Sequence, residues 1–354
     1  MPATVARLPS RPSRPTIRID GESQPRLEAA MLSYRLHASV ESMASAEIEF
    51  GNWGGEDAGF QFFSRDILDF GKEIVVSLQN EILFQGRISA INGRFPSAGP
   101  PTIVVLAEDR LQDLRMTRRS RSFEQASLAD VADAIARDHG LTAQVEVETA
   151  VAPVLTQVNQ TDFAFLFDLA RRFDAKVHIS DQTLHVTEDR GTPPVELRWS
   201  GTLREFDVTA DLALQYSAII ASGWDVASKE AVSHETDSSE MSAEVGSDTG
   251  GAALLEEFFE PRIETLAHLK PSTVTEAREF ANGAYRRMAR DFVIGEGECE
   301  TDPLIHVGAM LELSGLGDLF DGQYRTLEVT HCFDPQLGAL SEFRCHRAGI
   351  GGPS

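Results

Sequence analysis

The sequence predicts a mainly β protein with an α+β insert: two similar small β-barrels follow one another, and an inserted α/β domain interrupts the first. Three observations lead to this prediction. Most of the chain alternates apolar and polar residues, which is the period of half-buried strands. Amphipathic helical patterns are confined to residues 111–194 and to a segment after residue 273. A hairpin-like stretch near the start returns near the end, and such self-similarity indicates one structural unit used twice.

The repeated stretch covers residues 71–95 and 308–333. Both copies begin with a glycine, continue as an apolar strand and reach a Leu-Phe-x-Gly motif, so each has the pattern of a β-hairpin. A glycine two positions after a bulky phenylalanine permits a bulge or sharp bend where a small sheet closes. We therefore expect one barrel around each copy. The motif residues that mark the two hairpins are Leu83, Phe84, Gly86, Leu319, Phe320 and Gly322.

The first barrel is expected over residues 16–110 and is completed by residues 195–225. The alternation of residues 31–50 predicts one or two strands, and residues 100–107 form a nearly continuous apolar strand. Ahead of these strands, residues 1–15 are rich in Arg, Pro and Ser. Such a composition buries little surface, so we expect a mobile extension there.

Residues 111–194 are predicted to form the α/β insert. Ser127 is a good N-cap for a helix that runs to His139, and Asp162 can cap a second helix that runs to Phe173. Because helices and short strands mix here, this segment differs from the β chain on either side. Its strand patterns lie at residues 143–147, 176–179 and 183–186.

Residues 226–272 are predicted to be an acidic connector. Residues 228–251 hold mostly Ser, Glu, Asp and Gly with little apolar content, which is typical of an exposed or mobile loop. A capping box at Thr273 and Glu276 then predicts a helix. This helix and the second barrel account for residues 273–350.

Composition limits the possible partners and compartments. At 354 residues and 42% apolar content, the chain is long enough for two or three domains with their own cores. The formal net charge of −23 argues against nucleic acid, because phosphate binding relies on a basic surface. No apolar run approaches the ~18 residues of a membrane span, and the start lacks a signal-peptide pattern. Three cysteines are too few for a disulfide framework, which indicates a reducing compartment.

No set of residues has the spacing of a catalytic or metal site. The C-terminal Cys and His residues lack paired metal-ligand spacing, and strand alternation would point sequence neighbours apart. The sequence contains no P-loop, nucleophile elbow or His-Glu-x-x-His motif. We therefore assign no catalytic, cofactor-binding or metal-binding residue and expect no enzyme activity. The C-terminal group consists of Cys299, His306, His331, Cys332, Cys345 and His346.

Two charged clusters are interpreted as surface features. The basic cluster is short and lies in an acidic chain, so it is expected to be a solvated or partner-facing loop. Alternating glutamates near the C-terminal half are expected to form the solvent face of a strand. The clusters are Arg115, Arg118, Arg119 and Arg121, and Glu296, Glu298 and Glu300.

Several short blocks, taken together in order and spacing, resemble the tail hub proteins of contractile phages and related injection systems. This family is also called late control protein D and forms the front part of VgrG. One departure is Asp174, where the family usually has a glycine after the second helix; Asp adopts the left-handed conformation at modest cost. The blocks include Phe84-Gln85-Gly86-Arg87-Ile88, Ala107-Glu108-Asp109, Gln160-Thr161-Asp162-Phe163, Gly223-Trp224-Asp225, Asp302-Pro303-Leu304 and Asp321-Gly322-Gln323-Tyr324.

The resemblance implies a structural baseplate or tail hub that forms a homotrimer. Two barrels in each of three chains would make a six-part ring that joins a sixfold tail tube to a threefold spike. The implied partners are a tail tube or tube-initiator ring protein, a spike and other baseplate proteins. Since this chain ends at Ser354 without a spike region, the spike is expected to be a separate polypeptide. The implied location is a phage tail or injection-system particle assembled in the bacterial cytoplasm.

Two alternatives remain open from the sequence. One is a hub-associated cell-wall hydrolase, although barrel, insert and connector leave no spare domain of the size a hydrolase needs. The other is a tube-initiator or adaptor ring protein, which would form a stable hexamer rather than a trimer.

Overall fold

The computed structural model describes residues 14–54, 59–188, 193–226, 228–334, 336 and 338–351. Its elements are mostly strands, so the predicted mainly β class with helical insertions is confirmed. The mobile extension expected over residues 1–15 lies outside the described residues except for its last two. The chain divides into two compact units. Unit 1 comprises Met1–Asp109, Glu298–His306 and Glu328–Glu342, and unit 2 comprises Arg110–Gly297, Val307–Leu327 and Phe343–Ser354.

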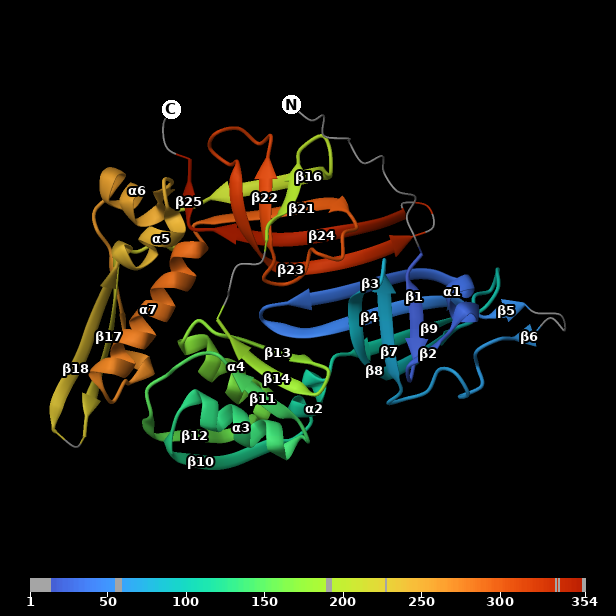
Figure 1. The fold of residues 1–354 in the computed structure, drawn as a ribbon, viewed down its shortest axis with the longest axis horizontal. Helices are drawn as coiled ribbons and strands as arrows, with labels where there is room; N and C mark the ends of the chain where they lie inside the picture. The colour runs from blue at the N-terminus through green and yellow to red at the C-terminus, as the bar shows by residue number, and fades with distance from the viewer. Residues whose placement is uncertain are drawn as a thin grey trace. The chain divides into compact units, whose positions relative to one another are not determined.

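Unit 1 is built on an antiparallel sheet (Figure 1). Short turns connect most of its strands, so sequence neighbours pair directly. One helix, α1 (Pro25–Ala30), precedes β3 and buries Leu27. The complete strands are β1 (Thr16–Ile19), β2 (Glu22–Ser23), β3 (Met31–Ser39), β4 (Ser42–Gly51), β5 (Trp53–Gly54), β6 (Gly59–Phe60), β7 (Glu73–Leu78), β8 (Glu81–Arg94) and β9 (Thr102–Glu108). Parts of β21 (Val293–Glu300), β23 (Gly322–Asp334) and β24 (Gly338–Arg347) belong to this unit as well.

The main sheet of unit 1 is open rather than a closed barrel. The order of the sheet is β16-β21-β24-β23-β3-β4-β9-β8-β7-β1-β2, where β16 spans Leu203–Ala210. Within the described residues the two end strands of this order do not pair with each other. The end strand β2 has two residues. So short a strand offers too few hydrogen bonds to complete a barrel. The expected small barrel is therefore observed as an open antiparallel sheet.

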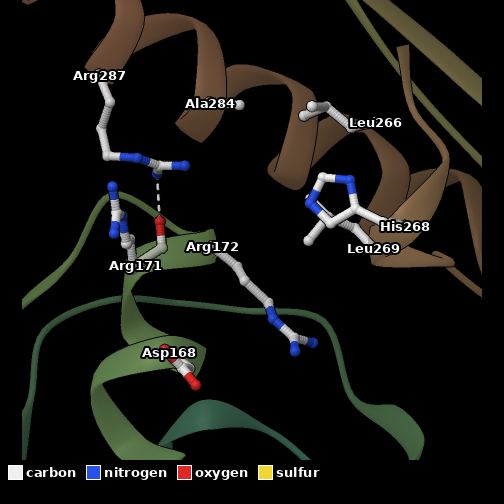
Figure 2. Close-up of a pocket in the computed structure, with 8 residues that line it drawn as sticks. All are labelled: Asp168, Arg171, Arg172, Leu266, His268, Leu269, Ala284 and Arg287. Carbon is white, nitrogen blue, oxygen red and sulfur yellow. Dashed lines mark hydrogen bonds between the residues drawn. The ribbon is translucent and has the colours of Figure 1, made fainter. Parts of the chain in front are cut away.

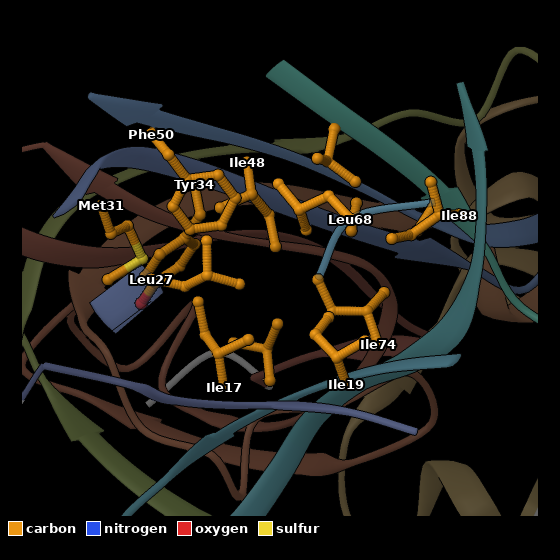
Figure 3. Close-up of a cluster of buried hydrophobic side chains, with 14 of the residues drawn as sticks. Ile17, Ile19, Leu27, Met31, Tyr34, Ile48, Phe50, Leu68, Ile74 and Ile88 are labelled. Carbon is orange, nitrogen blue, oxygen red and sulfur yellow. The ribbon is translucent and has the colours of Figure 1, made fainter. Parts of the chain in front are cut away.

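A single apolar cluster forms the core of unit 1 (Figure 3). Alternate residues of the strands contribute to it, as the period of two requires. Leu27 covers the cluster from α1, and Ile17 and Phe50 are fully buried within it. Burying each such side chain contributes about 1.5–3 kcal/mol relative to leaving it exposed.

The hairpin formed by β7 and β8 is closed by a two-residue turn. Gln79 and Asn80 have φ values of 53° and 72°. Two consecutive positive φ values are typical of the tight turn whose twist matches paired antiparallel strands. The turn lies one residue before the position expected from the sequence.

Unit 2 contains the predicted α/β insert. Its two longer helices and short strands occur where the sequence predicts them. Ser127 caps α3 in a reciprocal capping box with Asp130. The second helix is capped by Thr161 rather than Asp162, which is instead its first, buried residue. The elements are α2 (Leu111–Arg115), β10 (Arg118–Ala126), α3 (Leu128–Asp138), β11 (Thr142–Val145), β12 (Ala152–Thr161), α4 (Asp162–Arg172), β13 (Lys176–Ser180) and β14 (Thr183–Thr187).

Residues 195–225, which the sequence places with the first barrel, lie in unit 2. Strand β15 (Val195–Arg198) pairs in parallel with β22 (Met310–Ser314), and β17 (Ala218–Asp225) lies between β18 and β20. The alternation of these strands was recognised from the sequence, but alternation does not specify which strand is the neighbour. The other strands of this part are β16 (Leu203–Ala210), β18 (Glu230–Asp237), β19 (Thr249–Gly250), β20 (Ile263–Leu266) and β25 (Gly349–Ile350).

The segment expected to be an acidic connector is largely ordered. Strand β18 pairs with β17 along its whole length and buries Val232 and Thr236. Its acidic residues are all exposed, and Glu235 and Asp237 alternate with the buried positions, so a polar composition still permits a half-buried strand. Short helices and the long α7 follow. They are η1 (Ser238–Met241), α5 (Ser242–Val245), α6 (Gly251–Phe258), η2 (Ala267–Leu269) and α7 (Val274–Arg290).

Candidate functional site

The hairpins β7–β8 and β22–β23 share one hydrogen-bond pattern at their bases. In each hairpin the N–H of a glycine donates to the carbonyl oxygen of a residue on the opposite strand. The N–H of that same residue donates to the carbonyl oxygen of the residue that follows the glycine. This pattern repeats the unit predicted from the sequence. In the first hairpin Gly71 N lies 2.8 Å from Ile88 O, and Ile88 N lies 3.0 Å from Lys72 O. In the second hairpin Gly308 N lies 2.8 Å from Thr326 O, and Thr326 N lies 2.9 Å from Ala309 O.

Counted from these glycines, the pairing register differs from the sequence motif. Gly86 pairs with Ile74, and the residue in the matching position of the second hairpin is Tyr324, which pairs with Leu311. Gly86 therefore corresponds to Tyr324 and not to Gly322. A shift of two residues leaves the same face of the strand turned the same way, which is why both alignments satisfy the apolar pattern.

The structure places the other motif residues in different surroundings. Leu83 and Phe84 lie within β8, and Phe84 is buried. Leu319 and Phe320 lie in the connection between β22 and β23, before the strand begins. The four side chains therefore do not mark equivalent positions of the two hairpins.

Gly86 and Gly322 are required for different reasons. A Cβ at Gly86 would overlap the carbonyl oxygen of Glu108 and the ring of Phe84. Gly322 has a φ of 138° and lies under the guanidinium of Arg347, leaving no room for a Cβ. Gly86 permits close approach of two strands, whereas Gly322 leaves space for a buried cation.

Unit 1 carries an exposed aromatic cluster. The ring centroids of Trp53 and Phe60 are 5.4 Å apart, those of Phe60 and Phe63 5.0 Å, and those of Phe63 and Phe95 5.2 Å. Trp53, Phe60 and Phe95 are 51%, 55% and 67% exposed. Aromatic side chains that gather at a surface are typical of protein interfaces. We call these four residues the aromatic cluster, and it is a candidate contact surface that the sequence did not reveal.

Unit 2 contains a pocket of about 360 Å³ between the last turn of α4 and α7 (Figure 2). Asp168, Arg171 and Arg172 line it from α4, and Arg287 lines it from α7. On the side facing these arginines lie Leu266 and Leu269. The pocket therefore combines cationic and apolar walls, and we call it the arginine pocket.

The arginines of α7 differ in how their charges are balanced. Arg286 pairs with Asp174 and Glu240, and Arg290 pairs with Asp174 and Glu244. Arg287 instead donates to the carbonyl oxygen of Arg171 at the end of α4. Burial lowers the pKa of the Arg287 guanidinium; the charge of Asp174 acts to raise it, and the neighbouring arginines act to lower it. The pocket therefore holds cationic charge that a carboxylate would stabilise.

The basic cluster expected to be a solvated or partner-facing loop includes Arg119 and Arg121 of β10, which form part of a polar network in unit 2. Arg121 contacts Asp162 at 2.8 Å, and His139 contacts the other oxygen of Asp162 at 2.9 Å. Burial acts to raise the pKa of the Asp162 carboxyl, but the hydrogen bonds and charges around it lower the pKa overall. At least two of the four arginines therefore stabilise the insert.

Several of the C-terminal Cys and His residues have separate hydrogen-bond partners. His331 donates to or accepts from Ser341 at 2.7 Å, and His346 contacts Asp291 at 2.9 Å. Cys299 and Cys345 are buried and form no disulfide. Among the described residues, no group of three or more His, Cys, Asp or Glu could hold a metal ion. No helix in the described part of the chain is long and apolar enough to cross a membrane.

Comparison with solved structures defines the class of fold. A 43 kDa tail protein of prophage MuSo2 from Shewanella oneidensis aligns with a TM-score of 0.69 at 15% identity, covering 95% of this chain and 98% of that chain. An E. coli component of the type VI secretion system aligns with a TM-score of 0.60 at 11% identity, covering 95% and 79%. A chain of the Francisella PdpA–VgrG complex aligns with a TM-score of 0.52 at 10% identity, covering 96% and 59%.

The chain thus has the fold of phage tail proteins, and its resemblance to tail hub proteins is confirmed at the level of the fold. The family model described as the Alg8 N-terminal domain matches residues 11–334, so the chain belongs to that family. No curated protein matches the sequence.

Proposed function

We propose that this chain is a structural hub of a phage tail or injection-system baseplate. Three copies form a ring, and the two similar hairpins of each copy give that ring near-sixfold character. One face of the ring then meets a hexameric tail tube or tube-initiator ring, and the other meets a trimeric spike. Assembly takes place in the bacterial cytoplasm, and other baseplate proteins surround the ring.

The observation that carries this proposal is the shared pairing pattern of β7–β8 and β22–β23. Gly71 and Gly308 begin the two hairpins with the same pair of hydrogen bonds. One chain that presents two similar units can double the apparent symmetry of a trimer. A trimer built in this way can face a sixfold partner without a separate adaptor.

Further support comes from the comparisons and from the surface of unit 1. The similar folds belong to tail proteins, a component of the type VI secretion system and a VgrG complex, which are parts of larger assemblies. The aromatic cluster gives this chain a surface suited to a protein partner. We therefore assign a structural role rather than a catalytic one.

Native mass measurement of the purified full chain, alone and with the co-expressed spike, tests this proposal. A mass of three copies supports the hub. A stable hexamer would instead identify a tube-initiator or adaptor ring. Zymography on peptidoglycan is the companion measurement, because a lytic band would support a hydrolase.

A further inference from the structure

We propose that the arginine pocket binds the acidic, phenylalanine-bearing segment at the end of α6 from a neighbouring copy of this chain. The segment comprises residues 256–260, with the sequence Glu-Glu-Phe-Phe-Glu. This inference rests on the trimer of the proposed function and identifies a contact between neighbouring copies that would close the trimeric ring.

The pocket offers cationic groups that have no carboxylate partner in their own unit. In the part of the chain that the structure describes, neither Arg172 nor Arg287 makes a salt bridge, whereas Arg286 and Arg290 on the same helix are paired with carboxylates. Arg172 is held with its guanidinium 5.8 Å from the ring centroid of Phe280. A guanidinium group from each of the two helices suits a carboxylate, with which arginine can form paired hydrogen bonds.

Two leucines give the pocket an apolar contact area. Leu266 and Leu269 line it together with His268, and both leucines are only partly exposed. A ligand that matches the whole pocket therefore carries an apolar side chain next to its carboxylate. An isolated anion such as phosphate would leave these leucines without a contact.

The end of α6 has this combination. Phe258 and Phe259 are 65% and 56% exposed. Glu256, Glu257 and Glu260 flank them, and all three are exposed. Large apolar side chains this exposed and surrounded by carboxylates are typical of a segment that is covered in an assembly.

The contact joins two different surfaces of the molecule, because the segment lines no part of the pocket in its own chain. A segment on one copy that fits a pocket on the next makes a head-to-tail interface. Such an interface closes into a ring when the rotation between copies permits it. A trimeric ring needs this kind of contact, since a two-fold interface alone yields dimers.

Charge favours this occupant. The chain has 55 acidic and 32 basic residues, so two copies repel one another over most of their surfaces. The arginine pocket offers cationic charge to an approaching acidic segment. The pocket therefore fixes how the two copies align as well as attracting them to each other.

Cysteine crosslinking of the full chain tests the contact. Leu269→Cys places a thiol in the pocket and Phe258→Cys places one on the segment, in a background where the half-buried Cys332 is changed to Ser. Mild oxidation of the double variant is expected to give covalent dimers and trimers that disappear on reduction. Each single variant, and a Leu269→Cys variant combined with Val226→Cys, should give neither; Val226 is 80% exposed and lies outside the segment.

The outcomes separate this contact from the proposed function. Trimers by native mass with no crosslink would overturn the pocket contact and leave the hub intact. Monomers at every concentration would overturn both. Crosslinking of Leu269→Cys to a tube or spike protein in assembled particles, instead of to a second copy, would assign another occupant and overturn the proposal.

Charge reversal provides an independent readout. Arg172→Glu should raise the concentration at which the trimer half-dissociates by at least about tenfold, and Glu257→Arg should do the same. Combining both changes in one chain should restore most of the affinity, because every interface then regains one opposite pair. Additive weakening in the double variant would contradict the contact.

Discussion

Asp174 adopts the left-handed conformation after α4, with a φ of 60°, and its carboxylate accepts a hydrogen bond from Arg290 Nη1 at 2.7 Å. The same carboxylate oxygen accepts from Arg286 Nε at 3.1 Å. A glycine would fit the backbone at this position at lower cost. The aspartate instead ties the end of α4 to α7, which explains the departure from glycine seen in the sequence.

Asp174→Gly should therefore lower the free energy of unfolding. The change removes two charge-assisted hydrogen bonds, while the relaxed backbone offsets part of the loss, so we expect about 1–2 kcal/mol of destabilisation. Asp174→Ala should cost roughly 1 kcal/mol more, because it keeps the unfavourable φ. Chemical denaturation measures both.

Asp181→Gly is the matched control. Asp181 also has a positive φ, 53°, but it is exposed and its side chain makes no ion pair within the described residues. The glycine should be neutral or slightly stabilising, within about 0.5 kcal/mol. Equal effects of the two glycine variants would show that the contacts of Asp174 contribute nothing.

Gly86→Ala should destabilise unit 1. The added methyl group would overlap the carbonyl oxygen of Glu108, which belongs to the backbone and cannot rotate away. Overpacking of this kind costs about 1–3 kcal/mol. Gly59→Ala serves as the control, because a Cβ there meets no atom within 4 Å. A Gly86→Ala protein as stable as the Gly59→Ala protein would contradict the close approach of β8 and β9.

His331 should make the protein less stable in mild acid. Burial lowers the pKa of this imidazole from 6.5 to about 4. Between these values the unfolded chain binds a proton that the folded chain does not bind, so stability is present above pH 6.5 and is lost as the pH falls towards 4. The loss from this group is on the order of 3 kcal/mol across the window.

A His331→Gln variant tests this assignment. Its free energy of unfolding should fall less between pH 6.5 and 4.5 than that of the unchanged protein, because one source of the pH dependence is gone. His234→Gln, at a partly exposed position, should keep the original slope. Parallel pH profiles for the unchanged protein and the His331→Gln variant would refute the role of burial at this site.

The aromatic cluster should matter for assembly more than for folding. Trp53→Ser combined with Phe60→Ser removes two of the three exposed rings of the cluster, and we expect a loss in stability of about 1 kcal/mol per aromatic contact. Incorporation into tail particles should fall much further, since aromatic anchors can contribute about 2 kcal/mol or more to an interface. Phe70→Ser changes an equally exposed residue outside the cluster and should incorporate normally. Normal incorporation of the double variant would exclude the cluster from the assembly contacts.

Local signals were predictable from the sequence because they depend on adjacent residues. Ser127 and Thr273 accept from backbone N–H groups of the helices they precede. The left-handed Asp174 also follows from the end of a helix. The strands within residues 195–225 were recognised, but the unit that contains them could not be derived from alternation, which does not identify the neighbouring strand.

The candidate sites were not predictable in the same way. The arginine pocket brings Arg287 against Arg171, which is 116 residues away in sequence. The aromatic cluster likewise gathers rings from separate strands and turns. The Leu-Phe-x-Gly repeat indicated two related hairpins. An alignment of the two hairpins that is shifted by two residues satisfies the same apolar pattern, so only the pairing register of the strands could distinguish the two alignments.

The central claim is that the β7–β8 and β22–β23 hairpins act as equivalent units of a ring of three chains. A cryo-EM reconstruction of the assembled ring, computed without imposed symmetry, tests it most directly. We predict three copies, with the two kinds of hairpin alternating around the axis at steps of about one-sixth of a turn. Six copies in the ring, or hairpins at unrelated radii and heights, would contradict the claim.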